Sequence, residues 1–140
     1  MIALRLALLT MFLALPGCGD VMASYYKGIS TTAIAANACR DVLSEAHEGK
    51  TKAVAEKAKA GHPAEAQADL DKWTPVYEKV KTACTSLKVG AKLALDAAPV
   101  VEATVTKKKD AMGWIVRLAK LGFEAMATLT EAGLKRPGGK

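Results

Sequence analysis

The sequence holds few of the residues that build catalytic or metal-binding sites. It has only two histidines, His47 and His62, and three cysteines in 140 residues. Glu45 and Glu48 are the only further ligand types near His47, whereas a structural zinc site needs about four ligands. The CxxC, CxxCH, GxSxG and P-loop motifs are all absent. We therefore expect a protein that is not an enzyme and that binds no metal and no cofactor.

Aromatic residues and strand patterns are also scarce. Aromatic side chains make up only 5% of the chain, and no segment alternates apolar and polar residues as a half-buried strand does. The formal charge is +6, but basic and acidic residues are interleaved, which is typical of a solvated helix surface. No basic stripe contains stacking aromatics, so the sequence gives no reason to expect a nucleic-acid partner.

The amino-terminal segment has the layout of an export signal. Arg5 lies in a short leading region, an apolar run covers residues 6–15, and Pro16 and Gly17 then break the helix. A helix needs about 20 apolar residues to cross a bilayer, so this run is too short to act as a permanent anchor. It predicts a cleaved signal peptide and a mature protein outside the cytoplasm.

The end of this segment, Leu15-Pro16-Gly17-Cys18, resembles the lipobox of bacterial lipoproteins. The resemblance covers these four residues only. It implies that residues 1–17 are removed, that Cys18 receives a diacylglyceryl group, and that the new amino terminus is acylated, for example with palmitate. Gly19 stands where an Asp would favour the inner membrane, so the resemblance favours an outer-membrane anchor that faces the periplasm.

The sequence also contains an alternative cleavage site. Val21-Met22-Ala23 offers small residues at the positions that an ordinary signal peptidase recognises, and cleavage there would discard Cys18. The protein would then be a soluble periplasmic or secreted one. In both alternatives Cys39 and Cys84 are the remaining thiols, and an oxidising compartment favours a disulfide between them. The other possibility is that both are buried, unpaired core residues.

The mature chain reads as an all-α protein with three long helices. Breaks at Gly61-His62-Pro63 and at Ala98-Pro99, and a cap at Gly133, predict helices over residues 21–60, 63–97 and 99–132. Gly49 could end the first helix early, and Pro75 could kink the second. The expected architecture is an elongated up-down-up bundle at 25–133, with a short tether at 18–24 and a disordered basic tail at 134–140.

Apolar residues recur at steps of three and four in each predicted helix, which is the spacing of helices that pack side by side. The three stripes are Tyr25, Ile29, Thr32, Ala36, Cys39, Leu43 and Ala46; Leu70, Trp73, Tyr77, Val80, Cys84, Leu87, Ala91 and Leu95; and Ala111, Ile115, Leu118, Gly122, Ala125, Leu129 and Ala132.

The cysteines test this topology. In an antiparallel hairpin that turns at residues 61–63, residues whose numbers add up to about 123 lie at the same height, and Cys39 and Cys84 meet this condition. Both also belong to the inward stripes. The hairpin register therefore predicts the pairing, which closes a loop of about 45 residues and stabilises by roughly 4 kcal/mol.

The predicted function is a non-catalytic envelope lipoprotein with a structural or protein-interaction role. Its expected partners are the membrane, through the lipid, and an envelope protein; the sequence leaves the oligomeric state open. The alternative is a periplasmic bundle that binds a small molecule or another hydrophobic compound. Trp73, Tyr77 and Trp114 would then line a cavity between the helices.

Overall fold

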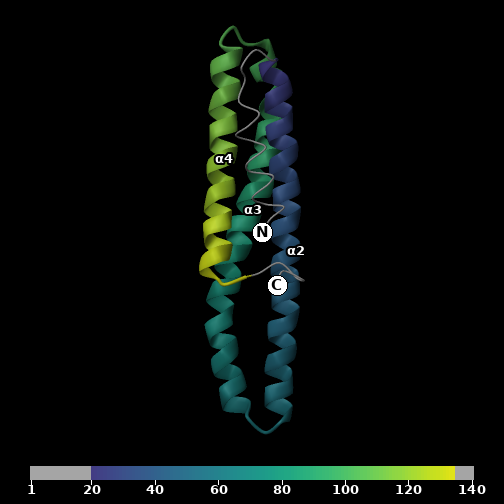
Figure 1. The fold of residues 1–140 in the computed structure, drawn as a ribbon, viewed down its shortest axis with the longest axis vertical. Coiled ribbons are helices and arrows are strands. Elements are labelled where there is room, and N and C mark those ends of the chain that lie inside the picture. Colours follow the sequence, from purple (N-terminus) through teal and green to yellow (C-terminus); the bar gives the residue numbers. More distant parts are fainter. Residues whose placement is uncertain (1–19, 135–140) are drawn as a thin grey trace.

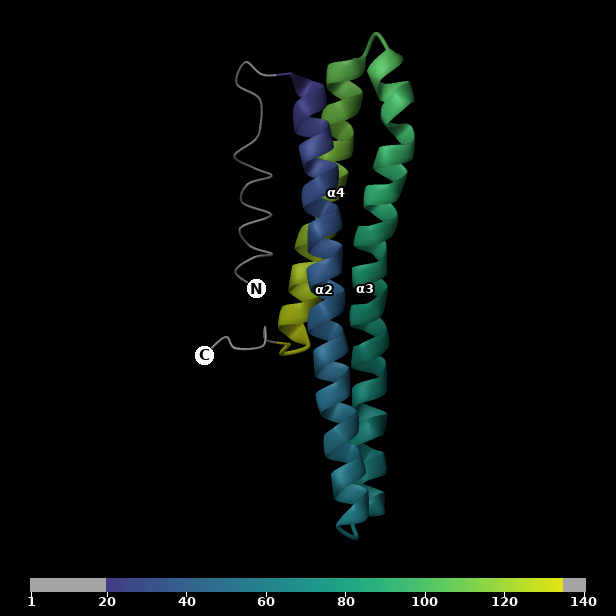
Figure 2. The same ribbon diagram turned by 90° about the vertical axis from the view of Figure 1, so that its right-hand side faces the viewer.

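A computed structural model describes residues 20–134 and contains three helices, α2 (Val21–Lys59), α3 (Pro63–Ala103) and α4 (Lys107–Glu131). No strand occurs among these residues. Successive helices run in opposite directions, so that α2 runs down, α3 up and α4 down in the figures, and each helix contacts the other two (Figures 1 and 2). The predicted all-α three-helix bundle is confirmed.

The predicted stripes form the core. All but five of their members are buried. Four of these five, Ala46, Leu70, Tyr77 and Ala132, are half-buried, and Leu95 is the one clear error. Leu95 is 52% exposed, because Ala94 and Ala98 occupy the inward positions of α3 in its place. Two apolar clusters result, one around Tyr25 and Leu118 and the other around Cys84 and Leu129. Small alanines let the three helices approach closely.

The hairpin between α2 and α3 turns where the sequence predicts. Gly61 has a φ of +92°, a left-handed conformation that glycine adopts without strain, and Pro63 occupies the first turn of α3. Gly49 does not interrupt α2. This turn fixes the register of the two long helices.

The predicted helix break at Ala98-Pro99 is wrong. α3 continues through both Pro75 and Pro99 and ends at Ala103, so the connection to α4 consists of residues 104–106. A proline inside a helix removes one hydrogen bond, and burial of Ala94, Ala98 and Val101 on the inward face offsets that loss. Helix propensity is a weaker determinant here than packing against α2 and α4.

The ends of the bundle also differ from the predicted boundaries. α2 begins at Val21 with Asp20 as its cap, so residues 21–24 are helical and do not form a tether. At the other end, Gly133 caps α4 with a φ of +67°, as predicted, and Leu134 packs into the core at 8% exposure. Leu134 therefore belongs to the bundle. The remaining tail, 135–140, lies outside the described residues.

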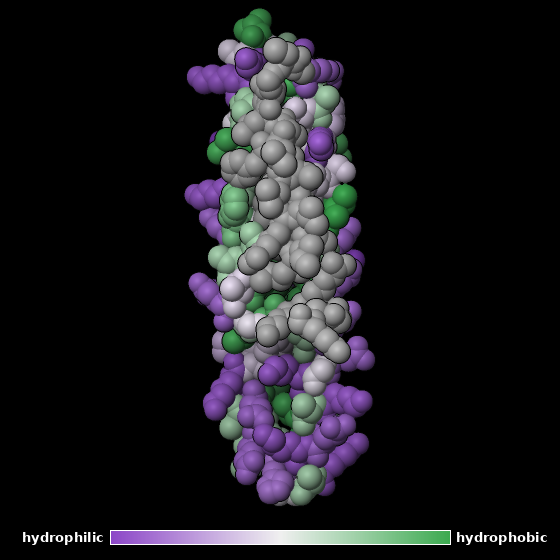
Figure 3. Space-filling model, viewed as in Figure 1, coloured by the Kyte–Doolittle hydropathy of each residue, from purple (hydrophilic) through white to green (hydrophobic). Residues whose placement is uncertain are grey.

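α4 is much shorter than the hairpin, which has a structural consequence. Lys79 pairs with Glu131 at the end of α4, and beyond this point only α2 and α3 continue toward their turn (Figure 1). We call residues 50–72 the two-helix arm. Ala66 is its only buried residue, and hydrophilic side chains dominate its surface (Figure 3).

Candidate functional site

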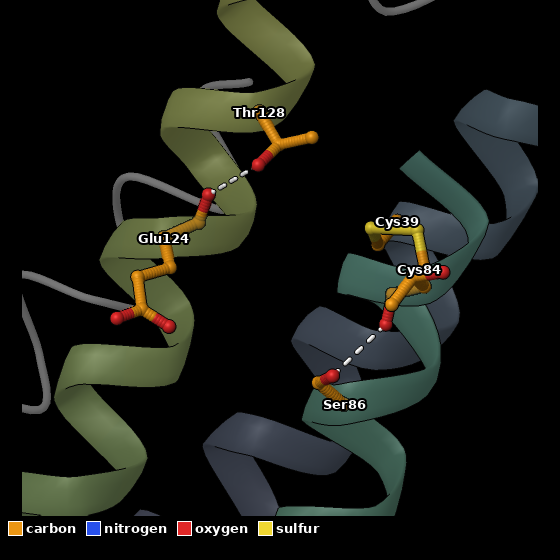
Figure 4. Close-up of a disulfide and its surroundings, with 6 residues drawn as sticks. Cys39, Cys84, Ser86, Glu124 and Thr128 are labelled. Carbon is orange, nitrogen blue, oxygen red and sulfur yellow. Dashed lines mark hydrogen bonds between the residues drawn. A yellow bond between two sulfur atoms is a disulfide. The ribbon is translucent and has the colours of Figure 1, made fainter. Parts of the chain in front are cut away.

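A disulfide joins the two long helices in the middle of the bundle. Cys39 of α2 and Cys84 of α3 have Cα atoms 5.5 Å apart and are 1% and 6% exposed (Figure 4). They lie 45 residues apart in sequence. This geometry agrees with the pairing that the hairpin register predicts.

An aromatic cluster lies on the side of this disulfide that faces the two-helix arm. The ring of His47 lies 4.3 Å from that of Tyr77, and the rings of Trp73 and Tyr77 are 6.3 Å apart. Trp73 Nε1 donates a hydrogen bond to His47 Nδ1 at 3.1 Å. A neutral imidazole that accepts at Nδ1 carries its proton on Nε2, so Nε2 is left as a donor.

The third aromatic residue of the predicted ligand site lies elsewhere. Trp114 is half-buried and packs against the cluster around Tyr25 and Leu118, with the guanidinium of Arg117 5.3 Å from its ring. Trp73 belongs to the other cluster. The structure therefore brings Trp73 and Tyr77 together but not Trp114.

A groove of about 420 Å³ follows the seam between α2 and α3, and we call it the seam groove. All of its lining comes from these two helices: Ala36, Asn37, Arg40, Leu43, Ser44, His47, Tyr77, Lys81, Cys84, Thr85 and Lys88. The lining includes three cations, Arg40, Lys81 and Lys88, and contains no carboxylate. Its electrostatic character is therefore positive.

Several polar groups of the seam groove are not used by the fold. Within residues 20–134, the side chains of Asn37, Ser44 and Thr85 form no hydrogen bond. By contrast, Thr82 and Ser86 of the same helix donate to backbone carbonyls one turn earlier, at 2.9 Å each (Figure 4 shows the bond of Ser86). The groove therefore offers free donors and acceptors to a ligand.

A second groove, of about 450 Å³, lies between α3 and α4. Val89, Gly90, Leu93 and Leu121 supply its apolar part, and the Leu121 side chain rests directly on Gly90. Val89 and Leu93 are about half exposed. This groove offers fewer charged groups than the seam groove, with Glu78 and Lys81 at one end.

The surroundings of Tyr25, Asp69 and Glu131 shift the pKa values of these three groups. Burial raises the pKa of Tyr25, whose hydroxyl donates to the carbonyl of Ala94. A hydrogen bond from Lys57 lowers the pKa of Asp69, and one from Lys79 lowers the pKa of Glu131. Each of these shifts follows from burial or from a hydrogen bond within an ion pair.

The described residues also bear on the other predicted site features. Among residues 20–134 there is no group of three or more metal-ligand side chains, and His62 lies at the hairpin turn beside Glu65. No helix in this part of the chain is long and apolar enough to cross a bilayer. Cys18, the predicted lipidation site, lies outside the described residues.

The sequence motifs suggest no role for His47 beyond metal binding and do not predict the seam groove. Two features of the sequence point to a positive groove at this place. Lys81 and Lys88 are seven residues apart, so they lie on one face of α3. The hairpin register then places Arg40 at the height of Cys84, between the two lysines.

Comparison with known protein families, with curated proteins and with solved structures finds no match for this chain.

Proposed function

We propose that this protein is a non-catalytic lipoprotein of the bacterial envelope, exported and held at a membrane by lipid on Cys18. The observation that supports export most directly is the buried Cys39–Cys84 disulfide. Structural disulfides form and persist in oxidising compartments such as the periplasm and are rare in the cytosol. A lipobox-like segment followed by a disulfide-bonded domain is what we expect of a protein that is exported across the inner membrane into the envelope.

The start of α2 favours cleavage before Cys18 over cleavage after Ala23. Asp20 accepts a hydrogen bond from the Met22 amide at 2.9 Å, and the Met22 side chain is 5% exposed. Cleavage after Ala23 would remove both the helix cap and a core side chain from the mature domain. Loss of an N-cap alone costs about 1 kcal/mol.

The proposed anchor would orient the bundle. α2 starts only three residues after Cys18, at the end of the bundle where α3 connects to α4 (Figure 2). Lys107, Lys108 and Lys109 lie at this same end, where basic side chains can contact anionic headgroups. α3 has 41 residues and is therefore about 60 Å long, so the charged two-helix arm would project away from the membrane.

This orientation supports a role in contact with other envelope components. The arm carries both signs of charge and buries little of its own surface, so it is suited to a polar protein partner. We place the protein at the outer membrane rather than the inner one, facing the periplasm, because Gly19 follows the modified cysteine.

The proposal is tested by metabolic labelling with an acyl-chain probe in wild type, Cys18→Ser and Cys84→Ser. We expect label on wild type and on Cys84→Ser, and none on Cys18→Ser. Mass spectrometry of the mature amino terminus separates the two cleavage sites. An unlabelled wild-type chain that begins at Ser24 would overturn the lipid anchor.

Export is tested separately by alkylating free thiols in intact cells before lysis. Wild type should then show a mobility shift on reduction in a gel, and Cys84→Ser should show none. Free thiols at both Cys39 and Cys84 in wild type would contradict the assignment to the envelope.

A second candidate function is the binding of a small molecule between the helices. The seam groove favours it, because its volume lies within the range of about 300–1,000 Å³ that small-molecule sites occupy. This function is compatible with a lipid anchor, because the groove lies in the three-helix region and not at the anchored end.

A further inference from the structure

We propose that the seam groove binds a small organic anion, a carboxylate or phosphate ester attached to one apolar or aromatic ring. This inference rests on the second candidate function and specifies its ligand. It depends on the charge of the lining, on the free polar groups beside that charge, and on the apolar floor below them.

The charge of the groove is unbalanced. Arg40 and Lys88 form no ion pair and no side-chain hydrogen bond within residues 20–134, and the ammonium of Lys81 lies 5.7 Å from the centre of the Tyr77 ring. By comparison, Lys79 pairs with Glu131 and Lys92 pairs with Asp96 on the exposed surface of the bundle. Three cations around one concave site attract an anion more strongly than the same cations spread over a convex surface.

Neutral donors stand beside these cations. Ser44 and Asn37 on α2 and Thr85 on α3 have side chains that the fold leaves unbonded. His47 adds an Nε2 proton, because its Nδ1 accepts from Trp73. An anion that reaches Arg40 could therefore also accept uncharged hydrogen bonds, and arginine itself offers two parallel ones to a carboxylate or phosphate.

The floor of the groove is apolar. Ala36 and Leu43 of α2, Cys84 of α3 and the ring of Tyr77 supply it. Tyr77 is held in place by His47, whose ring lies 4.3 Å away. A site with a charged rim and a rigid apolar floor favours a ligand that has both an anionic group and a ring over inorganic phosphate or a neutral ring.

The test uses the full chain purified in a non-ionic detergent and three probes: phenyl phosphate, phenol and inorganic phosphate. Isothermal titration calorimetry should detect one site for phenyl phosphate. Binding of phenol and of inorganic phosphate should be at least about 10-fold weaker, because each lacks one of the two recognised parts. Equal affinity for phenyl phosphate and inorganic phosphate, or no binding of phenyl phosphate, would overturn the proposal.

A matched pair of triple variants locates the site. R40E/K81E/K88E should weaken phenyl phosphate binding by at least about 10-fold, since it removes every charged donor in the lining. K27E/K52E/K108E changes the net charge by the same amount at exposed positions outside the groove, and it should bind within about 2-fold of wild type. An equal loss in both variants would mean attraction by overall charge and would refute the site.

One further variant covers the case in which the first triple variant does not fold. Ser44→Trp places a bulky ring into the groove from the exposed side of α2, while the charge stays unchanged. Its helical circular dichroism should match wild type and its phenyl phosphate binding should be lost. Wild-type affinity in this variant would contradict the inference.

Acyl labelling of Cys18 tests the lipid anchor independently of ligand binding. Failure of the ligand site and failure of the lipoprotein proposal are therefore distinguishable.

Discussion

Trp73 donates its indole hydrogen to Nδ1 of His47, and this bond links α2 to α3 where the three-helix region gives way to the two-helix arm. Trp73 is 6% exposed, and a buried indole N–H needs a partner. His47 is thus an acceptor in the core as well as part of the seam groove. The same imidazole stabilises the hairpin and fixes the position of Tyr77.

Removing this acceptor should be visible in tryptophan fluorescence. In a Trp114→Phe background, where Trp73 is the only tryptophan, His47→Ala should shift the emission to longer wavelength, because the indole then contacts water. His62→Ala is the matched control, since His62 lies exposed at the hairpin turn. An unchanged spectrum in His47→Ala would show that the indole does not depend on His47.

The disulfide should contribute a large part of the stability. Replacing both Cys39 and Cys84 by Ser should lower the free energy of unfolding by about 4 kcal/mol, because the unfolded chain regains the freedom of a 45-residue loop. Urea unfolding followed by circular dichroism measures the difference. Reduced wild type should match the double variant, and Cys18→Ser should match oxidised wild type. Identical midpoints with and without reductant would contradict this prediction.

Two glycines should respond to alanine in opposite directions. Gly49 lies inside α2 with nothing within 4 Å of an added Cβ, so Gly49→Ala should raise stability by about 1 kcal/mol through helix propensity. Gly61 also has open space but has a φ of +92°, so Gly61→Ala should lower stability by about 1 kcal/mol. Thermal unfolding of both variants tests the turn geometry, and the same sign for both would refute it.

Tyr25 should make the fold sensitive to alkali. Burial raises the pKa of its hydroxyl in the folded protein, so its contribution is complete below pH of about 10, the ordinary pKa, and is lost as pH rises through the folded value. Tyr25→Phe should cost about 1 kcal/mol at pH 8, where the hydrogen bond to Ala94 is lost. Between pH 8 and pH 11 the variant should lose less stability than wild type. A parallel decline in both proteins would argue against this role for Tyr25.

The sequence predicts the hairpin well because two independent signals agree. The Gly61-Pro63 turn and the inward stripes set the same register, and that register brings Cys39 to Cys84. The sequence predicts the second turn too early, because a proline usually ends a helix. In the structure the buried alanines around Pro99 keep α3 helical as far as Ala103. The predicted burial of Leu95 is wrong because alanines occupy the inward positions beside it. Alanine is a weak signal of burial in a sequence where it is common.

The candidate site was harder to predict. Trp73 and Tyr77 are one helical turn apart, so their proximity follows from the sequence. Trp114 lies beside the apolar stripe of the third predicted helix, but no sequence signal fixes how far along the hairpin α4 packs. The structure places Trp114 against the other cluster. The seam groove depends on the spacing of two helix surfaces, which a one-dimensional pattern does not encode.

The early end of α4 has a consequence for local motion. The two-helix arm has one buried residue, so its backbone amides should exchange with solvent through openings that leave the rest of the bundle folded. We expect such openings to begin at the turn. The disulfide between Cys39 and Cys84 holds α2 and α3 together and so limits how far the two helices can separate. Residues 50–72 should therefore open and close locally while the opposite end of the bundle, where α2 begins, keeps its structure.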